Sequence, residues 1–89
     1  MTKQPETLFE FPCLFPIKVM GMPEMDLESI VKVALTAVGV DSADVKLDSR
    51  LSRGGRYTSV TATFEAKSKA QLDSLYHSLT THPAVKIVL

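Results

Sequence analysis

The strongest constraint on the fold lies in residues 45–66, where two alternating segments flank a glycine turn. In the first, Val45, Leu47 and Leu51 alternate with charged residues, as in a strand with one buried face. The second, Tyr57–Ala66, is rich in β-branched and aromatic residues and places apolar side chains at every second position. The Arg53–Arg56 turn between them holds two glycines, which can adopt a positive φ. The pattern predicts a β-hairpin.

Apolar residues recur with the period of a helix in two other segments. The first pattern predicts a helix over Pro23–Val38, with the proline in its first turn and Gly39 as a left-handed cap. The second helix is predicted to begin at Ser68, which forms a Ser-x-x-Gln capping box with Gln71. The proline after His82 stops it.

Two further alternating segments, Phe15–Gly21 and Val85–Leu89, predict the first and last strands. Residues 1–7 are polar and predict a flexible tail, which leaves residues 8–89 for a single domain. The resulting order, βαββαβ, is that of the ferredoxin-like α+β fold. Right-handed crossovers place both helices on one face of a four-stranded antiparallel sheet, with the first and third strands in the centre.

Charge balance limits the classes of partner. The ten basic and ten acidic side chains cancel, which argues against a general polyanion binder. The balance is nevertheless uneven along the chain. Residues 1–30 hold two basic and five acidic groups, whereas residues 46–56 hold four basic and one acidic group. This local basic hairpin could meet an acidic partner, or the acidic region of a second copy.

Features that would direct the chain out of the cytoplasm are missing from the sequence. No apolar run approaches the ~20 residues that a membrane span needs. The polar N-terminus lacks the apolar core of a signal peptide. The single cysteine cannot form an internal disulfide. We therefore expect a cytoplasmic protein that does not associate with membranes.

Three separated motifs carry a resemblance to a known family. The segments Glu10–Gly21, Gly55–Thr61 and Gln71–Tyr76, together with the closing Val85–Leu89, resemble the small bacterial YbeD-like proteins. The resemblance extends over Leu8–Leu89. It implies a ferredoxin-like fold close to the ACT-type regulatory domains. The molecular function of that family is uncharacterised, so the resemblance implies no catalytic residues.

No set of residues has the pattern of a catalytic or metal site. Cys13 lies between prolines with no neighbouring histidine that could activate it. His77 and His82 are five residues apart, which is not the i, i+4 spacing of a helical metal site. Carboxylates cluster at the start of the first predicted helix, where the helix dipole favours negative charge. We expect no enzymatic activity, no cofactor and no metal.

The outward face of the predicted sheet is the most informative surface. Alternation assigns to it Lys18, Met20, Lys46, Asp48, Arg50, Tyr57, Ser59, Thr61, Thr63, Lys86 and Val88. This set is polar, mildly basic and rich in hydroxyl groups. A solvated sheet face, a subunit contact and a ligand-binding surface are all compatible with such a composition.

The leading hypothesis is a non-enzymatic regulatory or protein-interaction domain that binds a protein partner, a second copy or a small molecule. Gly21 enters the candidate set because ACT-type modules often bind ligands at this strand–helix turn. The candidate binding residues are Lys18, Met20, Gly21, Lys46, Arg50, Arg53, Arg56, Tyr57 and Ser59. The alternative is a nucleic-acid-binding module that uses the basic hairpin. It is disfavoured because RNA-recognition sheets stack bases on two aromatic residues, and here Tyr57 is followed by Ser59 at the second position.

Overall fold

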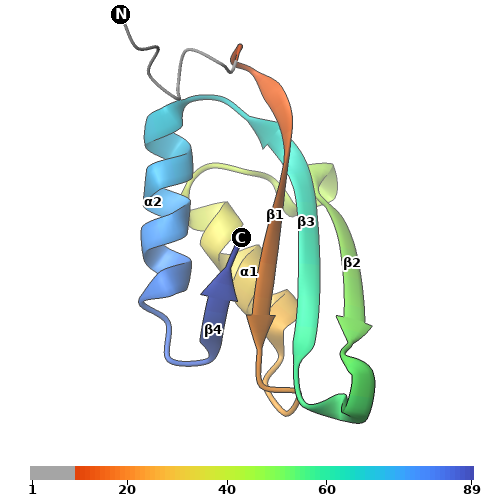
Figure 1. The fold of residues 1–89 in the computed structure, drawn as a ribbon. Coiled ribbons are helices and arrows are strands. Elements are labelled where there is room, and N and C mark those ends of the chain that lie inside the picture. The colour runs from red at the N-terminus through yellow and green to blue at the C-terminus, as the bar shows by residue number, and fades with distance from the viewer. Residues whose placement is uncertain (1–9) are drawn as a thin grey trace, which may run out of the picture.

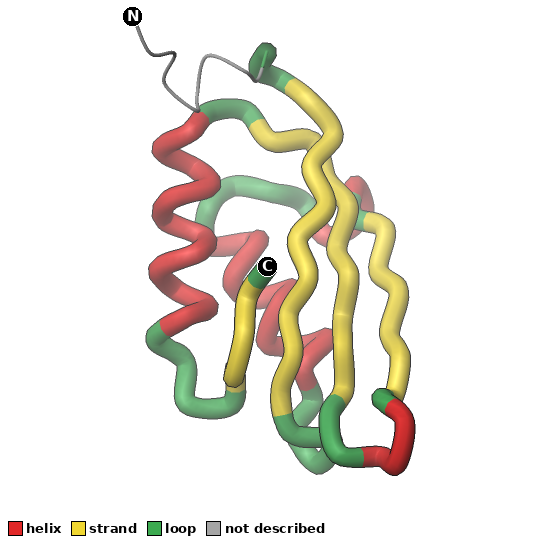
Figure 2. Tube along the Cα trace, in the orientation of Figure 1, coloured by secondary structure: helices red, strands yellow, loops and turns green. Residues whose placement is uncertain are grey.

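The computed structural model describes residues 10–89 and shows one antiparallel sheet with two helices on one of its faces (Figures 1 and 2). The elements in chain order are β1 (Cys13–Gly21), α1 (Leu27–Ala37), β2 (Lys46–Leu51), β3 (Thr58–Ala66), α2 (Lys69–Thr80) and β4 (Val85–Val88). The strand order is β2-β3-β1-β4, so β1 and β3 are central. The predicted ferredoxin-like fold is confirmed. The predicted tail, residues 1–7, lies outside the described residues.

The core lies between the helices and the inner side of the two central strands. The predicted inward residues of β3 are all fully buried: Val60, Ala62, Phe64 and Ala66. Ile17 and Val19 of β1 are buried beside them, and the ring of Phe15 lies 6.3 Å from that of Phe64. The helices contribute Leu27, Val31, Leu35, Leu75 and Leu79. These apolar contacts hold the helices against the sheet.

The start of α1 differs from its prediction. The helix begins at Leu27, not at Pro23, because Asp26 is its N-cap. The Asp26 carboxylate accepts hydrogen bonds from the backbone N–H of Ser29 at 3.3 Å and from the Ser29 hydroxyl at 2.8 Å. Pro23 instead belongs to the turn before the helix. At the other end Gly39 has a φ of 90°, as expected of a left-handed cap.

Ser68 caps α2 as predicted, but the reciprocal bond of the capping box goes to Lys67 instead of Ser68, and the same glutamine also joins the two helices. The Ser68 hydroxyl accepts a hydrogen bond from the backbone N–H of Gln71 at 3.1 Å. The Gln71 side chain accepts from the backbone N–H of Lys67 at 2.7 Å and donates to the Val38 carbonyl at 2.9 Å. One glutamine therefore satisfies backbone groups at the beginning of α2 and at the end of α1.

The last strand corrects the predicted outward face. The register between β4 and β1 shifts between Met20 and Gly21, which leaves Lys86 as an extra residue in a β-bulge. Ile87 therefore lies opposite Met20 on the outer face. Val88, predicted to face outward, is half-buried and packs against the core. The prediction was wrong by one position because simple alternation does not allow for the extra residue.

Gly21 lies where the backbone of β1 closely approaches the backbone of Ala84, so that a larger residue at this position should destabilise the fold. A Cβ on this buried glycine would clash with the Ala84 carbonyl oxygen and lie 3.0 Å from the Leu27 side chain. We expect Gly21→Ala to lower the free energy of unfolding by about 1–3 kcal/mol, as overpacking does elsewhere. Urea unfolding measures the change. Ser74→Ala, at an exposed position of α2, is the control and should shift stability by less than about 0.5 kcal/mol. Equal stability of the two variants would contradict the close approach.

The Asp26 cap predicts a pH dependence. The hydrogen bonds from Ser29 hold the pKa of the Asp26 carboxyl below its usual value of 3.8. The ionised cap therefore stabilises the fold fully above about pH 4, and this contribution is lost as the pH falls through the folded-state pKa. The Asp26→Asn variant removes the charge and one of the two oxygens that accept hydrogen bonds from Ser29. We expect the difference in urea midpoint between the native protein and this variant to narrow on acidification. A difference that widens below pH 4 would refute this.

Candidate functional site

The outer face of the sheet is organised in rows that cross the strands. One row contains, from β2 to β4, Arg50, Ser59, Met20 and Ile87. The next row contains Asp48, Thr61, Lys18 and Leu89. Leu89 joins this row because its backbone N–H donates to Lys18 at 2.8 Å and its carbonyl accepts from Lys18 at 3.1 Å. Side chains that are distant in sequence thus become direct neighbours.

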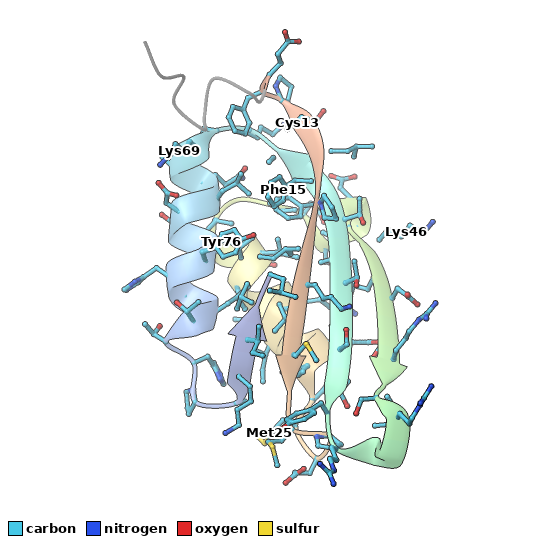
Figure 3. All side chains as sticks on the ribbon, viewed as in Figure 1. Cys13, Phe15, Met25, Lys46, Lys69 and Tyr76 are labelled. Carbon is cyan, nitrogen blue, oxygen red and sulfur yellow. The ribbon has the colours of Figure 1, made fainter. Side chains whose placement is uncertain are left out.

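Five of the nine predicted site residues come together in the cross-strand rows of this face. They are Lys18, Met20, Lys46, Arg50 and Ser59. The three basic side chains are exposed, whereas Met20 and Ser59, which lie opposite each other on the central strands, are half-buried. Figure 3 shows Lys46 extending away from the sheet beside β2. Arg50 Nε lies 3.6 Å from Asp48 Oδ2, but both side chains are open to solvent, so this ion pair adds little stability.

The other predicted residues of the basic hairpin lie at its turn. Arg53 and Arg56 flank two glycines with φ values of 80° and 71°, which confirms the predicted left-handed turn. The turn is closed by Ser52. Its backbone N–H donates to the Tyr57 carbonyl at 2.7 Å, and its hydroxyl accepts from the Tyr57 N–H at 2.9 Å. These bonds hold Tyr57 at the end of the outer face, directly before β3.

A shallow hollow of about 400 Å³ lies where this turn meets the loop after β1. Its lining residues are Met22, Pro23, Glu24, Gly55, Arg56 and Tyr57. The hollow therefore joins two predicted residues, Arg56 and Tyr57, to the loop that follows Gly21. Gly21 itself is buried, and the approach of the Ala84 backbone accounts for its missing side chain.

Sequence reasoning missed the apolar part of the outer face. Leu14, Ile87 and Leu89 are large hydrophobic residues with exposed fractions of 76%, 49% and 64%. Leu14 was outside the predicted strand, which was expected to begin only at Phe15. Pro16 is tolerated inside β1 because no backbone hydrogen bond to a neighbouring strand is needed at its nitrogen. The nitrogen points to the β4 side, like that of Lys18, and the pairing with β4 begins only at Lys18. The alternation of β1, extended back from Lys18 through Pro16, would have placed Leu14 on the outer face.

Two neighbouring regions of the described chain carry opposite charge. Residues 22–45, which contain α1, hold five carboxylates and one lysine. Residues 46–56, which contain β2 and the hairpin turn, hold four basic groups and one carboxylate. The hairpin is therefore positive, as the sequence predicted. The α1 region is negative, whereas the acidic excess was predicted for residues 1–30.

The single cysteine and the two histidines of the sequence lie away from the outer-face rows. Cys13 is half-buried at the start of β1. His82 Nδ1 accepts a hydrogen bond from the backbone N–H of Ala84 at 3.1 Å. Across residues 10–89, no three histidine, cysteine or acidic side chains gather as a metal site would require. No helix in the same range has the length and hydropathy to span a membrane.

Comparison with known proteins identifies the family. A profile described as protein of unknown function DUF493 matches residues 6–89. The chain belongs to the DUF493 family. A UPF0250 protein of Paraburkholderia phytofirmans is 40% identical over 89 residues, the full length of both chains. UPF0250 protein NE1487 of Nitrosomonas europaea is 43% identical over 84 residues, which cover 94% of this chain and 97% of that one. These matches confirm the resemblance to the YbeD-like proteins.

A solved structure supports the fold of this DUF493 chain. The solution structure of protein HP0495 from H. pylori superposes with a TM-score of 0.76, covering 99% of this chain and 90% of that one. The sequence identity is 18%, so this likeness concerns the fold alone.

The bulge in β4 predicts that neighbouring substitutions differ in cost. Val88→Thr should lower the free energy of unfolding by about 1 kcal/mol, because it places a hydroxyl against the core. Ile87→Thr should change it by less than about 0.5 kcal/mol, because this side chain faces outward beside Met20. Urea unfolding of both variants measures the contrast. A larger loss of stability in Ile87→Thr than in Val88→Thr would mean that Ile87 faces the core, as simple alternation along β4 predicted.

Proposed function

We propose that this DUF493 protein is a non-enzymatic protein-interaction domain that binds its partner with the outer face of the sheet and regulates through that contact. The observation that carries the proposal is the exposure of Leu14, Ile87 and Leu89 along β1 and β4. Isolated exposed apolar residues are ordinary, but a group on one sheet face rimmed by charged residues is typical of a docking surface.

The chemistry of the face indicates the kind of partner. Lys18 stands between the apolar residues and the polar half of the face, opposite Thr61 and bonded through its backbone to Leu89. Lys46 and Arg50 add positive charge along β2. A segment of another protein that carries apolar side chains and carboxylates would complement both halves. Its acidic groups would also speed association with the basic hairpin.

The alternative, nucleic-acid binding, finds less support on this face. Base stacking needs aromatic platforms on the binding surface. In residues 10–89, Tyr57 stands at the end of the face, whereas Phe64 is buried in the core and Phe15 packs against it. Lys18 and Thr61 are among the outward residues nearest the middle of the two central strands, and Met20 and Ser59 form the next row. The centre of the face therefore lacks a stacking group.

Matched variants test the docking face. The native protein and two variants are used to capture partners from extracts of the source cells. A protein bound through the outer face should be lost with the double variant Leu14→Ser, Ile87→Ser and retained with Val33→Ser. Val33 is an equally apolar control on α1 with an exposed fraction of 70%. With the purified partner, the double variant should raise Kd at least about tenfold, or ~1.4 kcal/mol.

Two results would overturn the proposal. The first is capture that survives the double variant but fails with Val33→Ser, which would move the contact to the helical side. The second is binding to RNA oligomers that weakens steeply with salt and disappears with Lys18→Ala and Arg50→Ala. That second result would favour the nucleic-acid alternative.

A further inference from the structure

The free edge of β2 is a second surface, distinct from the proposed docking face. β2 pairs with β3 from Lys46 to Leu51, and no described strand lies on its other side. Figures 1 and 2 show this edge on the side of the sheet away from α2. Within β2 only Leu47 is half-buried and the other residues are exposed. A second strand therefore has access to the edge.

The hydrogen-bond pattern shows which backbone groups point outward. The Ser52 N–H donates to the Tyr57 carbonyl, so even-numbered residues of this segment turn their backbone groups toward β3. Leu47, Ser49 and Leu51 consequently direct theirs to the open edge. This edge contains no proline and no bulge, two of the devices that commonly protect an edge strand from pairing. Charged side chains are a third device, so a strand that pairs here has to compensate the charges of Lys46, Asp48 and Arg50.

The β2 sequence is complementary to itself in antiparallel orientation. If a two-fold axis passes beside Ser49, this residue faces Ser49 of the partner subunit. Asp48 then faces the partner's Arg50, and Leu47 faces the partner's Leu51. We propose that β2 pairs with β2 of a second copy in this register, which joins two four-stranded sheets into one sheet of eight strands.

This register forms backbone hydrogen bonds between the two β2 strands and favourable side-chain pairs on both faces of the joined sheet. Three residue pairs that each exchange two backbone bonds give six hydrogen bonds across the axis. On the outer face each Asp48 meets an Arg50, and opposite charges in cross-strand pairs are stabilising. On the inner face Leu51, which is 64% exposed in the single chain, gains a leucine opposite it.

The other symmetric registers are less favourable. An axis beside Asp48 places two aspartates opposite each other and Lys46 opposite Arg50. An axis beside Arg50 places two arginines together. Like charges directly opposite are destabilising. An axis beside Leu47 or Leu51 lies near one end of β2, which runs from Lys46 to Leu51. Only part of the strand then overlaps with its copy, so at best a few opposite charges are paired.

Charge reversal tests the proposal. Asp48→Arg alone brings arginines together across the axis, and Arg50→Asp alone brings aspartates together. Each variant should weaken self-association by about tenfold or more in sedimentation equilibrium at low salt. The double variant Asp48→Arg, Arg50→Asp should restore it, and so should an equimolar mixture of the single variants. Circular dichroism confirms that each variant remains folded.

Cysteine cross-linking tests the register directly. In a Cys13→Ser background, the double variant Asp48→Cys, Arg50→Cys places cysteines opposite each other, with Cα atoms about 4.5 Å apart. Mild oxidation should give a covalent dimer. Asp48→Cys alone should not cross-link, because the residue opposite it is then an arginine.

Three outcomes would overturn the proposal. They are a native protein that stays monomeric at millimolar concentration, a dimer that is insensitive to the charge reversals, and efficient cross-linking of Asp48→Cys alone. None of them bears on the docking face, which is tested with Leu14 and Ile87. The two proposals therefore fail separately.

Discussion

The pairing of β1 with β3 is the constraint on which the rest of the structure depends. The ladder runs without interruption from Cys13 opposite Ala66 to Gly21 opposite Thr58. Because side chains alternate along each strand, this single register sends Ile17 and Phe64 into the core. It also fixes the outer rows, where Lys18 lies beside Thr61. A shift of one residue would exchange the buried face of each strand for its outer face.

The sequence predicts those parts of the fold that depend on repetition. Alternation in β3, the helical period and the Ser68 capping box were sufficient for the topology. The errors lie where two signals compete or one residue breaks the pattern. Pro23 and Asp26 both favour a helix start, and the bonds from Ser29 decide for Asp26. The bulge at Lys86 depends on tertiary pairing with β1, which the four residues of β4 do not encode locally.

The site was predictable in its polar half and not in its apolar half. Lys18, Lys46 and Arg50 follow from alternation, whereas Ile87 and Leu89 depend on where the bulge sets the phase of β4. The pKa shifts of Asp26 and Tyr76 have local structural causes. Hydrogen bonds from Ser29 lower the pKa of Asp26 at a helix cap, and burial raises the pKa of Tyr76. Neither group belongs to the outer face.

The two proposed contacts divide the charge of the hairpin between them. In the paired strands each Arg50 is opposed by an aspartate of the other copy, so its charge is largely compensated before a partner arrives. The positive charge left for an acidic partner then lies at Lys18, Lys46 and the turn arginines, Arg53 and Arg56. The twin outer faces would lie side by side in one continuous sheet, each with its own apolar stripe. A partner with two acidic segments could engage both stripes at once, with an avidity that a single face cannot provide.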